Sequence, residues 1–294
     1  MKLVFLHGRS QQDKDPLVLR QKWVAALRVG LEKGGLELPI DEWDILFPYY
    51  GNALRDVTSE MPESLATVRF PLQEQQAHFS CAVLQDCLDQ VGVTEEVIAE
   101  RTPPNDPRGE RLSIALSNEF FHKGLQLLDR YVPSARRRLI EATAADVSLY
   151  LHDPEVQGYI DNGVAKAFRD CGEDDTVVVG HSMGSIVAYH VLSQAGIVNC
   201  PVKALITVGS PLGMRVIRES LDPIEHPPNV GSWFNAYDPR DVVALNPLDQ
   251  SNFPVSPAIK NYAGVENESD NHHKIHGYLS DRVVATAIVK ALRD

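Results

Sequence analysis

An α/β fold with a mostly parallel sheet is predicted for this chain of 294 residues. Three observations indicate it: short apolar runs of strand length, helical patterns between those runs, and near-continuity of each run rather than alternation. Continuous apolar runs suit strands that helices cover on both faces, and strands that alternate with helices indicate an α/β sheet. The expected strands are Leu3–Leu6, Ile45–Phe47, Thr176–Val179, Leu205–Val208 and Trp233–Tyr237.

Helices are expected between these strands. Asp15-Pro16 is a start signal for a helix over Leu17–Leu31, and Gly34-Gly35 stop it. Three more are expected over Glu155–Phe168, over Met183–Leu192 and after Ser280-Asp281.

The interval from about residue 51 to residue 153 breaks this alternation. It contains no convincing strand, yet apolar residues recur in it at helical spacing. Two stripes carry this pattern: Leu116, Phe120, Leu125, Leu128 and Tyr131, then Leu139, Thr143, Val147 and Tyr150. The expected organisation is a discontinuous core of residues 1–50 and 154–294 with a helical cap insertion at residues 51–153.

Composition narrows the class of protein. The chain has 28 Lys and Arg against 40 Asp and Glu, a net charge of −12, which argues against a nucleic-acid partner. No apolar run approaches the length of a membrane-spanning helix, and no phosphate-binding glycine motif predicts a nucleotide cofactor. The four cysteines are irregularly spaced and the N-terminal apolar run has only four residues. Reduced thiols and a cytoplasmic location are therefore expected.

The sharpest motif is Gly180-His181-Ser182-Met183-Gly184, which stands between a β-branched strand and a helix-compatible segment. A serine on a tight strand-to-helix turn projects its hydroxyl clear of the backbone, and small neighbours let strand and helix cross closely. The amide of Met183 would then be one oxyanion donor at a helix N-terminus. The pattern predicts Ser182 as a nucleophile.

A serine hydroxyl needs a base and a residue that orients the base, and in this arrangement both follow it in the chain, acid before histidine. Two aspartates, Asp238 and Asp241, come directly after an expected strand. The candidate bases, His273 and His276, lie together before the last helix.

A second oxyanion donor is expected after the first strand, which ends in His7-Gly8. The following amide, of Arg9 or alternatively of Ser10, can turn towards the hydroxyl of Ser182.

Together these features resemble the α/β-hydrolase superfamily, in its lipase and esterase-like branch. The resemblance covers roughly residues 1–50 and 170–294, and it implies a sheet that is shortened because the two leading strands of the superfamily are missing. It favours Asp241 over Asp238, because Asp241 is followed by two apolar residues, and His276 over His273, because His276 precedes Gly277-Tyr278.

The expected function is a serine hydrolase that cleaves carboxylic esters, preferably acyl or lipid esters, through an acyl-enzyme. A thioesterase, an amidase or peptidase, and a non-catalytic binding protein with the insertion as its interaction module remain alternatives. A zinc site at the histidine cluster is disfavoured because the stretch reads as a loop, so neither metal nor cofactor is expected. The insertion is expected to cap the site, with transient contact to a membrane surface possible. Candidate substrate contacts are Tyr49, Tyr50, Phe120 and Phe121.

Overall fold

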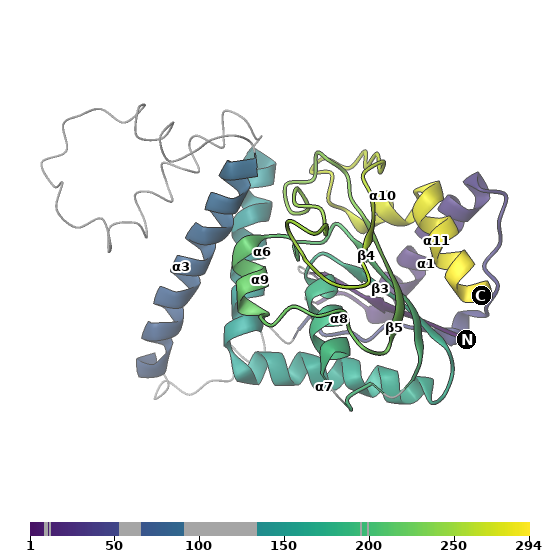
Figure 1. Ribbon diagram of the computed structural model, residues 1–294, viewed down its shortest axis with the longest axis horizontal. Helices are drawn as coiled ribbons and strands as arrows, with labels where there is room; N and C mark the ends of the chain where they lie inside the picture. Colours follow the sequence, from purple (N-terminus) through teal and green to yellow (C-terminus); the bar gives the residue numbers. More distant parts are fainter. Residues whose placement is uncertain (9–10, 12, 53–65, 91–133, 195, 199) are drawn as a thin grey trace, which may run out of the picture.

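A six-stranded, all-parallel sheet with helices on both faces forms the centre of the molecule in the computed structural model (Figure 1). The structure describes residues 1–8, 11, 13–52, 66–90, 134–194, 196–198 and 200–294. The strand order is β2-β1-β3-β4-β5-β6, and each neighbouring pair is parallel. The predicted α/β fold is confirmed. The strands are β1 (Lys2–Leu6), β2 (Ile45–Leu46), β3 (Thr176–His181), β4 (Val202–Val208), β5 (Val230–Ala236) and β6 (Lys260–Tyr262).

Five of the strands lie where the apolar runs predict them. The sixth, β6, has no such run, because it is a three-residue edge strand whose side chains are only partly buried. The predicted strand at Trp233 begins later than β5, because the exposed Gly231 and Ser232 interrupt the apolar pattern at the start of β5. Strands with a solvent-exposed part leave a weaker hydrophobic signal than strands covered on both faces.

Aspartate side chains fix where three helices begin. The Oδ1 atom of Asp15 accepts the amide of Leu17 at 2.8 Å, and Asp153 and Asp281 cap α7 and α11 in the same way. Each satisfies amides that have no partner within their helix. The helices are α1 (Pro16–Lys33), α3 (Ala66–Gln90), α6 (Ser134–His152), α7 (Pro154–Cys171), α8 (Met183–Ser193), α9 (Arg215–Ser220), α10 (Ile275–Leu279) and α11 (Arg282–Arg293), with a short 3-10 turn, η1, at Glu42–Asp44.

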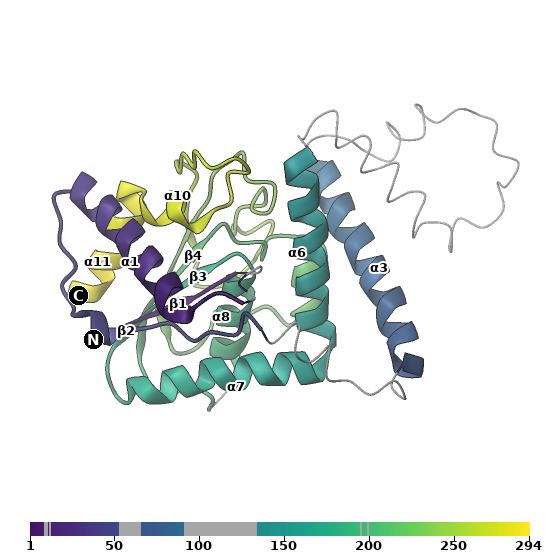
Figure 2. The same ribbon diagram turned by 180° about the vertical axis from the view of Figure 1, so that it is seen from behind.

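The sheet has an apolar layer on each face. In β1, Leu3 and Phe5 pack against residues of α1 and α11, whereas Val4 and Leu6 point to the opposite side, which α7 and α8 cover. Figure 2 shows α1 and α11 together on one side of the sheet and α7 crossing below it. Both faces are therefore buried, which explains the continuous apolar runs.

Two helices of the interval 51–153 are described, and they stand side by side at one end of the molecule (Figures 1 and 2). Helix α6 packs against α7 and α8, and α3 packs against α9. Buried side chains of both helices join the apolar cluster on the α8 side of the sheet: Phe79, Val83, Leu84, Leu88, Ile140, Val147 and Tyr150. The stripe from Leu116 to Tyr131 lies outside the described residues.

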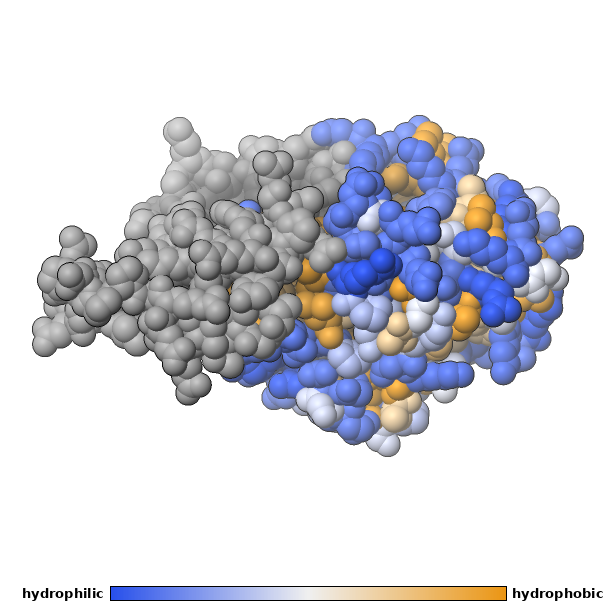
Figure 3. Space-filling view, turned by 90° about the horizontal axis from the view of Figure 1, so that it is seen from above, coloured by the Kyte–Doolittle hydropathy of each residue, from blue (hydrophilic) through white to orange (hydrophobic). Residues whose placement is uncertain are grey.

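The surface seen from above is mainly hydrophilic, with separate apolar patches near the middle of the view (Figure 3). In the described part of the chain, no helix has the length and apolar character to cross a membrane.

Candidate active site

Ser182 occupies the turn between β3 and α8 and has a left-handed backbone, with φ of 55° and ψ of −130°. A non-glycine residue in this region is strained, and such strain gathers at functional sites. The amide of Ser182 donates to the carbonyl of Val208 at 3.1 Å, which ties the turn to β4. The side chain is almost fully buried. The geometry is that of a nucleophile elbow.

Two glycines make this turn sterically possible. A Cβ atom on Gly180 would lie 2.8 Å from the carbonyl oxygen of Gly184, and one on Gly184 would lie 2.2 Å from the carbonyl oxygen of Leu6. At this point the backbone of α8 is in contact with the backbones of β3 and of the end of β1. The glycine positions of the motif have the steric role that the sequence predicts for them.

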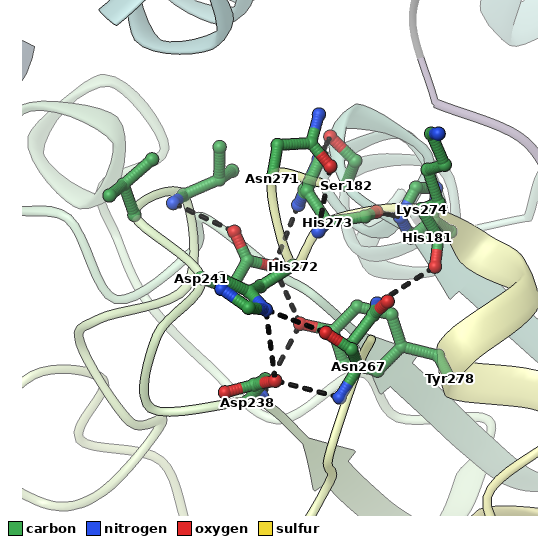
Figure 4. Close-up of polar contacts among 12 residues, drawn as sticks. His181, Ser182, Asp238, Asp241, Asn267, Asn271, His272, His273, Lys274 and Tyr278 are labelled. Carbon is green, nitrogen blue, oxygen red and sulfur yellow. Dashed lines mark hydrogen bonds and ion pairs between the residues drawn. The ribbon is translucent and has the colours of Figure 1, made fainter. Parts of the chain in front are cut away.

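His273 lies between Ser182 and Asp241 (Figure 4). Its Nε2 atom is 2.9 Å from Ser182 Oγ, and its Nδ1 atom is 2.7 Å from Asp241 Oδ2. Because a carboxylate oxygen accepts, Nδ1 carries the hydrogen, and Nε2 is left to accept the hydroxyl proton of Ser182. All three side chains are buried.

The structure brings His273, the alternative histidine, to Ser182, and not the preferred His276. The loop before α10 reaches the serine at His273, whereas His276 is exposed on α10 and makes no hydrogen bond to Ser182 or Asp241 within the described part of the chain. The pattern His276-Gly277-Tyr278 was misleading, because the feature that touches the site there is Tyr278.

Three donors converge on the buried carboxylate of Asp241. Oδ1 accepts the amide of Val243 at 3.0 Å, and Oδ2 accepts the hydroxyl of Tyr278 at 2.5 Å as well as Nδ1 of His273. Burial and then the charge of Asp241 raise the pKa of Tyr278 well above its usual value, so the phenol stays a donor. Tyr278 is a site residue that the sequence reasoning missed.

Asp238 is not next to Ser182 but holds the surrounding loops together. Its carboxylate accepts the amide and guanidinium of Arg240 at 2.8–3.0 Å and the amide of Asn267 at 2.7 Å. Burial opposes ionisation of Asp238, but these hydrogen bonds outweigh it and hold the pKa of its carboxyl below the usual value. Asp238 therefore ties the turn at Arg240 to the loop that begins at Asn267.

Asn267 organises the loop that carries His273. Its side-chain amide donates to the backbone carbonyl of Lys274 at 2.9 Å, and its backbone carbonyl oxygen is 2.6 Å from Nδ1 of His272. Within the loop, Oδ1 of Asn271 accepts the amide of His273 at 3.1 Å. Asn267 has no sequence signal, because its partners are set by the folded path of the loop.

His181, the histidine of the motif, holds the backbone of His273. Its Nε2 lies 2.8 Å from the carbonyl oxygen of His273. Burial, and then the neighbouring His273, lower the pKa of His181 well below its usual value. The neutral ring donates from Nε2 and fixes the backbone at His273.

The loop after β1 passes directly against the serine. A Cβ atom on Gly8 would lie 2.9 Å from Cβ of Ser182. His7 orients this loop: Nε2 accepts the amide of Tyr50 at 3.2 Å, so Nδ1 donates to the carbonyl of Gly8 at 2.7 Å. Arg9 and Ser10, the candidate oxyanion residues here, lie outside the described residues, whereas Met183 begins α8, where its amide has no intrahelical partner.

The two described residues among the predicted substrate contacts, Tyr49 and Tyr50, make structural hydrogen bonds. Tyr50 is buried and its hydroxyl donates to the carbonyl of His7, and the hydroxyl of Tyr49 donates to the carbonyl of Gln11 at 2.5 Å. Both tyrosines support the loop after β1, and neither is among the described residues that line the cavity at Ser182. Phe120 and Phe121 lie outside the described residues.

Residues 149–242 match a family model described as a PGAP1-like alpha/beta domain, which is of α/β-hydrolase type. The chain has an α/β-hydrolase fold. The matched segment includes Ser182 and Asp241, and His273 lies beyond it. A search of curated proteins found no match for the chain.

In this hydrolase fold a cavity of about 720 Å³ opens at Ser182 and His273. Its apolar lining comes mainly from α1, with contributions from α6 and α10: Leu19, Trp23, Ala25, Ala26, Val29, Leu139 and Ile275. Cavities of this size hold small organic ligands. Over the part of the chain that is described, no three His, Cys, Asp or Glu side chains are grouped as a metal site.

Proposed function

We propose that this chain is a serine hydrolase that cleaves carboxylic esters, preferably acyl or lipid esters, with Ser182 as nucleophile, His273 as general base and Asp241 as its orienting partner. One observation carries the proposal: the two hydrogen bonds of 2.9 Å and 2.7 Å that link the serine hydroxyl through His273 to Asp241. An elbow serine, a base in reach of its proton and a third group that fixes the tautomer are the parts that nucleophilic catalysis requires.

The first half of the reaction forms the acyl-enzyme. Ser182 Oγ attacks the ester carbonyl carbon while its proton passes to Nε2 of His273, and the carbonyl π electrons become the oxyanion. Asp241 stabilises the imidazolium. The amide of Met183 and an amide after Gly8, with Arg9 preferred and Ser10 the alternative, would hold the oxyanion. The carbon–oxygen bond to the alcohol then breaks as Nε2 returns the proton to the leaving oxygen.

The second half repeats these steps with water. Nε2 of His273 takes a proton from water, whose oxygen attacks the acyl carbon, and the serine leaves with the proton that His273 returns. The products are a carboxylic acid and free enzyme.

The interval 51–153 is proposed to cap the site. Leu139 of α6 supports this, because it belongs to that interval and lines the same cavity as Ser182. The apolar lining from α1 supports an acyl chain as the part of the substrate that enters.

Labelling and turnover test the proposal together. The wild type should react with a fluorophosphonate probe and hydrolyse p-nitrophenyl esters over a series of acyl lengths. Ser182→Ala should lose the label, and both Ser182→Ala and His273→Ala should lose at least about 10³-fold in kcat. His276→Ala is the matched control, and its kcat should fall by less than about tenfold, because His276 lines the cavity but makes no hydrogen bond to Ser182 or Asp241 in the described part of the chain.

The outcomes separate the competing functions. Equal losses for His276→Ala and His273→Ala would contradict the assigned base. Thioesters or amides cleaved far faster than esters would keep the triad but change the substrate class. Folded protein that neither takes the label nor cleaves any substrate would favour a binding protein with this fold.

A further inference from the structure

The cavity at Ser182 is lined by positive charge as well as by apolar groups. Three lysines line it, namely Lys14, Lys22 and Lys274, and no Asp or Glu is among its described lining residues. This contrasts with the whole chain, in which 40 acidic residues outnumber 28 basic ones. An adjoining hollow of about 630 Å³ is mixed in sign, with Glu266, Glu268 and Asp281 among its lining residues. The cavity that contains the serine thus differs from the adjoining hollow, whose lining has both acidic and basic side chains.

Lys14 and Lys22 carry charge that no carboxylate neutralises within the described part of the chain. Lys274 is paired with Asp270 at 3.4 Å, whereas the only hydrogen bond that Lys14 Nζ makes there is to Oε1 of Gln11 at 3.1 Å. Burial, and then the charge of Lys22, lower the pKa of Lys14. Two cations that face one cavity repel each other, and an anionic group bound between them would relieve that repulsion.

The apolar lining lies on the same helix as one of these charges. Leu19 and Trp23 of α1 are buried and line the cavity beside Lys22, which is exposed at its mouth. An amphipathic molecule could therefore place an apolar chain on α1 and a charged group at the lysines while its ester reaches Ser182. Long lysine side chains suit this, because their stems pack on apolar surface and their heads stay in water.

We infer that the substrate is an anionic ester: a molecule whose carboxylate or phosphate group is held by Lys14 and Lys22 and whose apolar part lies on α1. This inference rests on the proposed function, because it assigns a substrate class to the same serine.

Matched pairs of substrates test it. Each pair exchanges a carboxylate for a neutral group: mono-p-nitrophenyl adipate against p-nitrophenyl hexanoate for an anion on the acyl side, and meta-carboxyphenyl against meta-carbamoylphenyl butyrate for an anion on the alcohol side. The readout is the ratio of kcat/KM for the anionic ester to kcat/KM for the neutral ester. In at least one pair the wild type should give a ratio of about ten, as two exposed charge pairs would supply. The ratio should fall as salt rises from ~0.05 M to ~1 M.

Variants assign the preference to the lysines. The double variant Lys14→Gln/Lys22→Gln should bring the ratio close to one, and Lys14→Arg/Lys22→Arg should restore most of it. Lys166→Gln is the matched control, because Lys166 is an exposed lysine of α7 paired with Asp170 at 2.8 Å, on the opposite side of the sheet from α1. It should leave the ratio unchanged. Inhibition of hexanoate ester hydrolysis by hexyl phosphate and by hexanoate then shows which anionic group binds more tightly.

The result separates this inference from the proposed function. If neutral esters are hydrolysed and Ser182 is labelled, but the ratio is near one or survives in the double glutamine variant, the anionic subsite is refuted and the serine hydrolase stands. If Ser182 takes no label and no ester is cleaved, the proposed function fails and this substrate class fails with it.

Discussion

At the scale of single residues, the candidate site shows which parts of a triad a local pattern can specify. Ser182, Met183 and the two glycines of the motif are adjacent in the chain, so the strand-to-helix turn alone places them. Asp241 directly follows the β5 region and is therefore also close to where it was expected. These positions were predictable because each depends on one element and the turn after it.

The choice between histidines was not predictable in this way. His273 reaches Ser182 because Asp238 holds the amide of Asn267, and Asn267 in turn holds the carbonyl of Lys274. Those contacts join segments 29 residues apart or lie within an irregular loop. No periodicity or motif in the sequence predicts these contacts.

Tyr278 gives a residue-scale prediction. Replacing it by Phe removes the 2.5 Å hydrogen bond to Asp241 but keeps the buried ring. The carboxylate keeps the amide of Val243 and the ring of His273, so we expect kcat to fall by about tenfold and stability by about 1–2 kcal/mol. Steady-state kinetics and urea unfolding measure the two effects. An unchanged kcat with reduced stability would make Tyr278 a purely structural residue.

At the scale of elements, the packing of α1 against the C-terminal helices can be tested at a glycine. A Cβ atom on Gly30 would lie 2.4 Å from the carbonyl oxygen of Leu279 and 2.8 Å from Cβ of Ala285. Gly30→Ala therefore must push α1 away from α10 and α11, and we expect a loss of about 2 kcal/mol or more.

Gly158 in α7 is the matched control for that substitution. Nothing lies within 4 Å of the Cβ atom it would gain, so Gly158→Ala should stabilise the chain by about 0.5–1 kcal/mol through helix propensity. Both free energies come from urea unfolding at one pH. A Gly30→Ala variant as stable as the Gly158→Ala variant would contradict the close contact between α1 and α10.

At the scale of the whole molecule, the sequence predicted the sheet because most strands are buried on both faces and so carry unbroken apolar runs. It could not predict how α3 and α6 pack. Helical periodicity marks the apolar face of α6, but α8 and α9 come later in the chain, and only the folded topology brings α6 against α8 and α3 against α9.

The buried histidines make the stability of the whole fold depend on pH. Burial lowers the pKa of His7 to about 4 and that of His181 well below its usual value, and His7 is deeply enclosed beside Tyr50. In the unfolded chain these imidazoles bind protons near their ordinary pKa of about 6.5. As pH falls below that value, the unfolded state takes up protons that the folded state does not, so the free energy of unfolding must decrease.

The size of this effect follows from the two pKa values of His7. A difference of about 2.5 corresponds to about 3 kcal/mol of stability that is present above pH ~6.5 and lost as the pH falls towards ~4. Urea unfolding at a series of pH values should show this decline, and His7→Asn, though less stable at pH 7, should show a shallower one. A free energy of unfolding that stays level from pH ~7 to ~5 would mean that His7 takes up protons in the folded chain, and Nε2 of His7 could not then accept the amide of Tyr50.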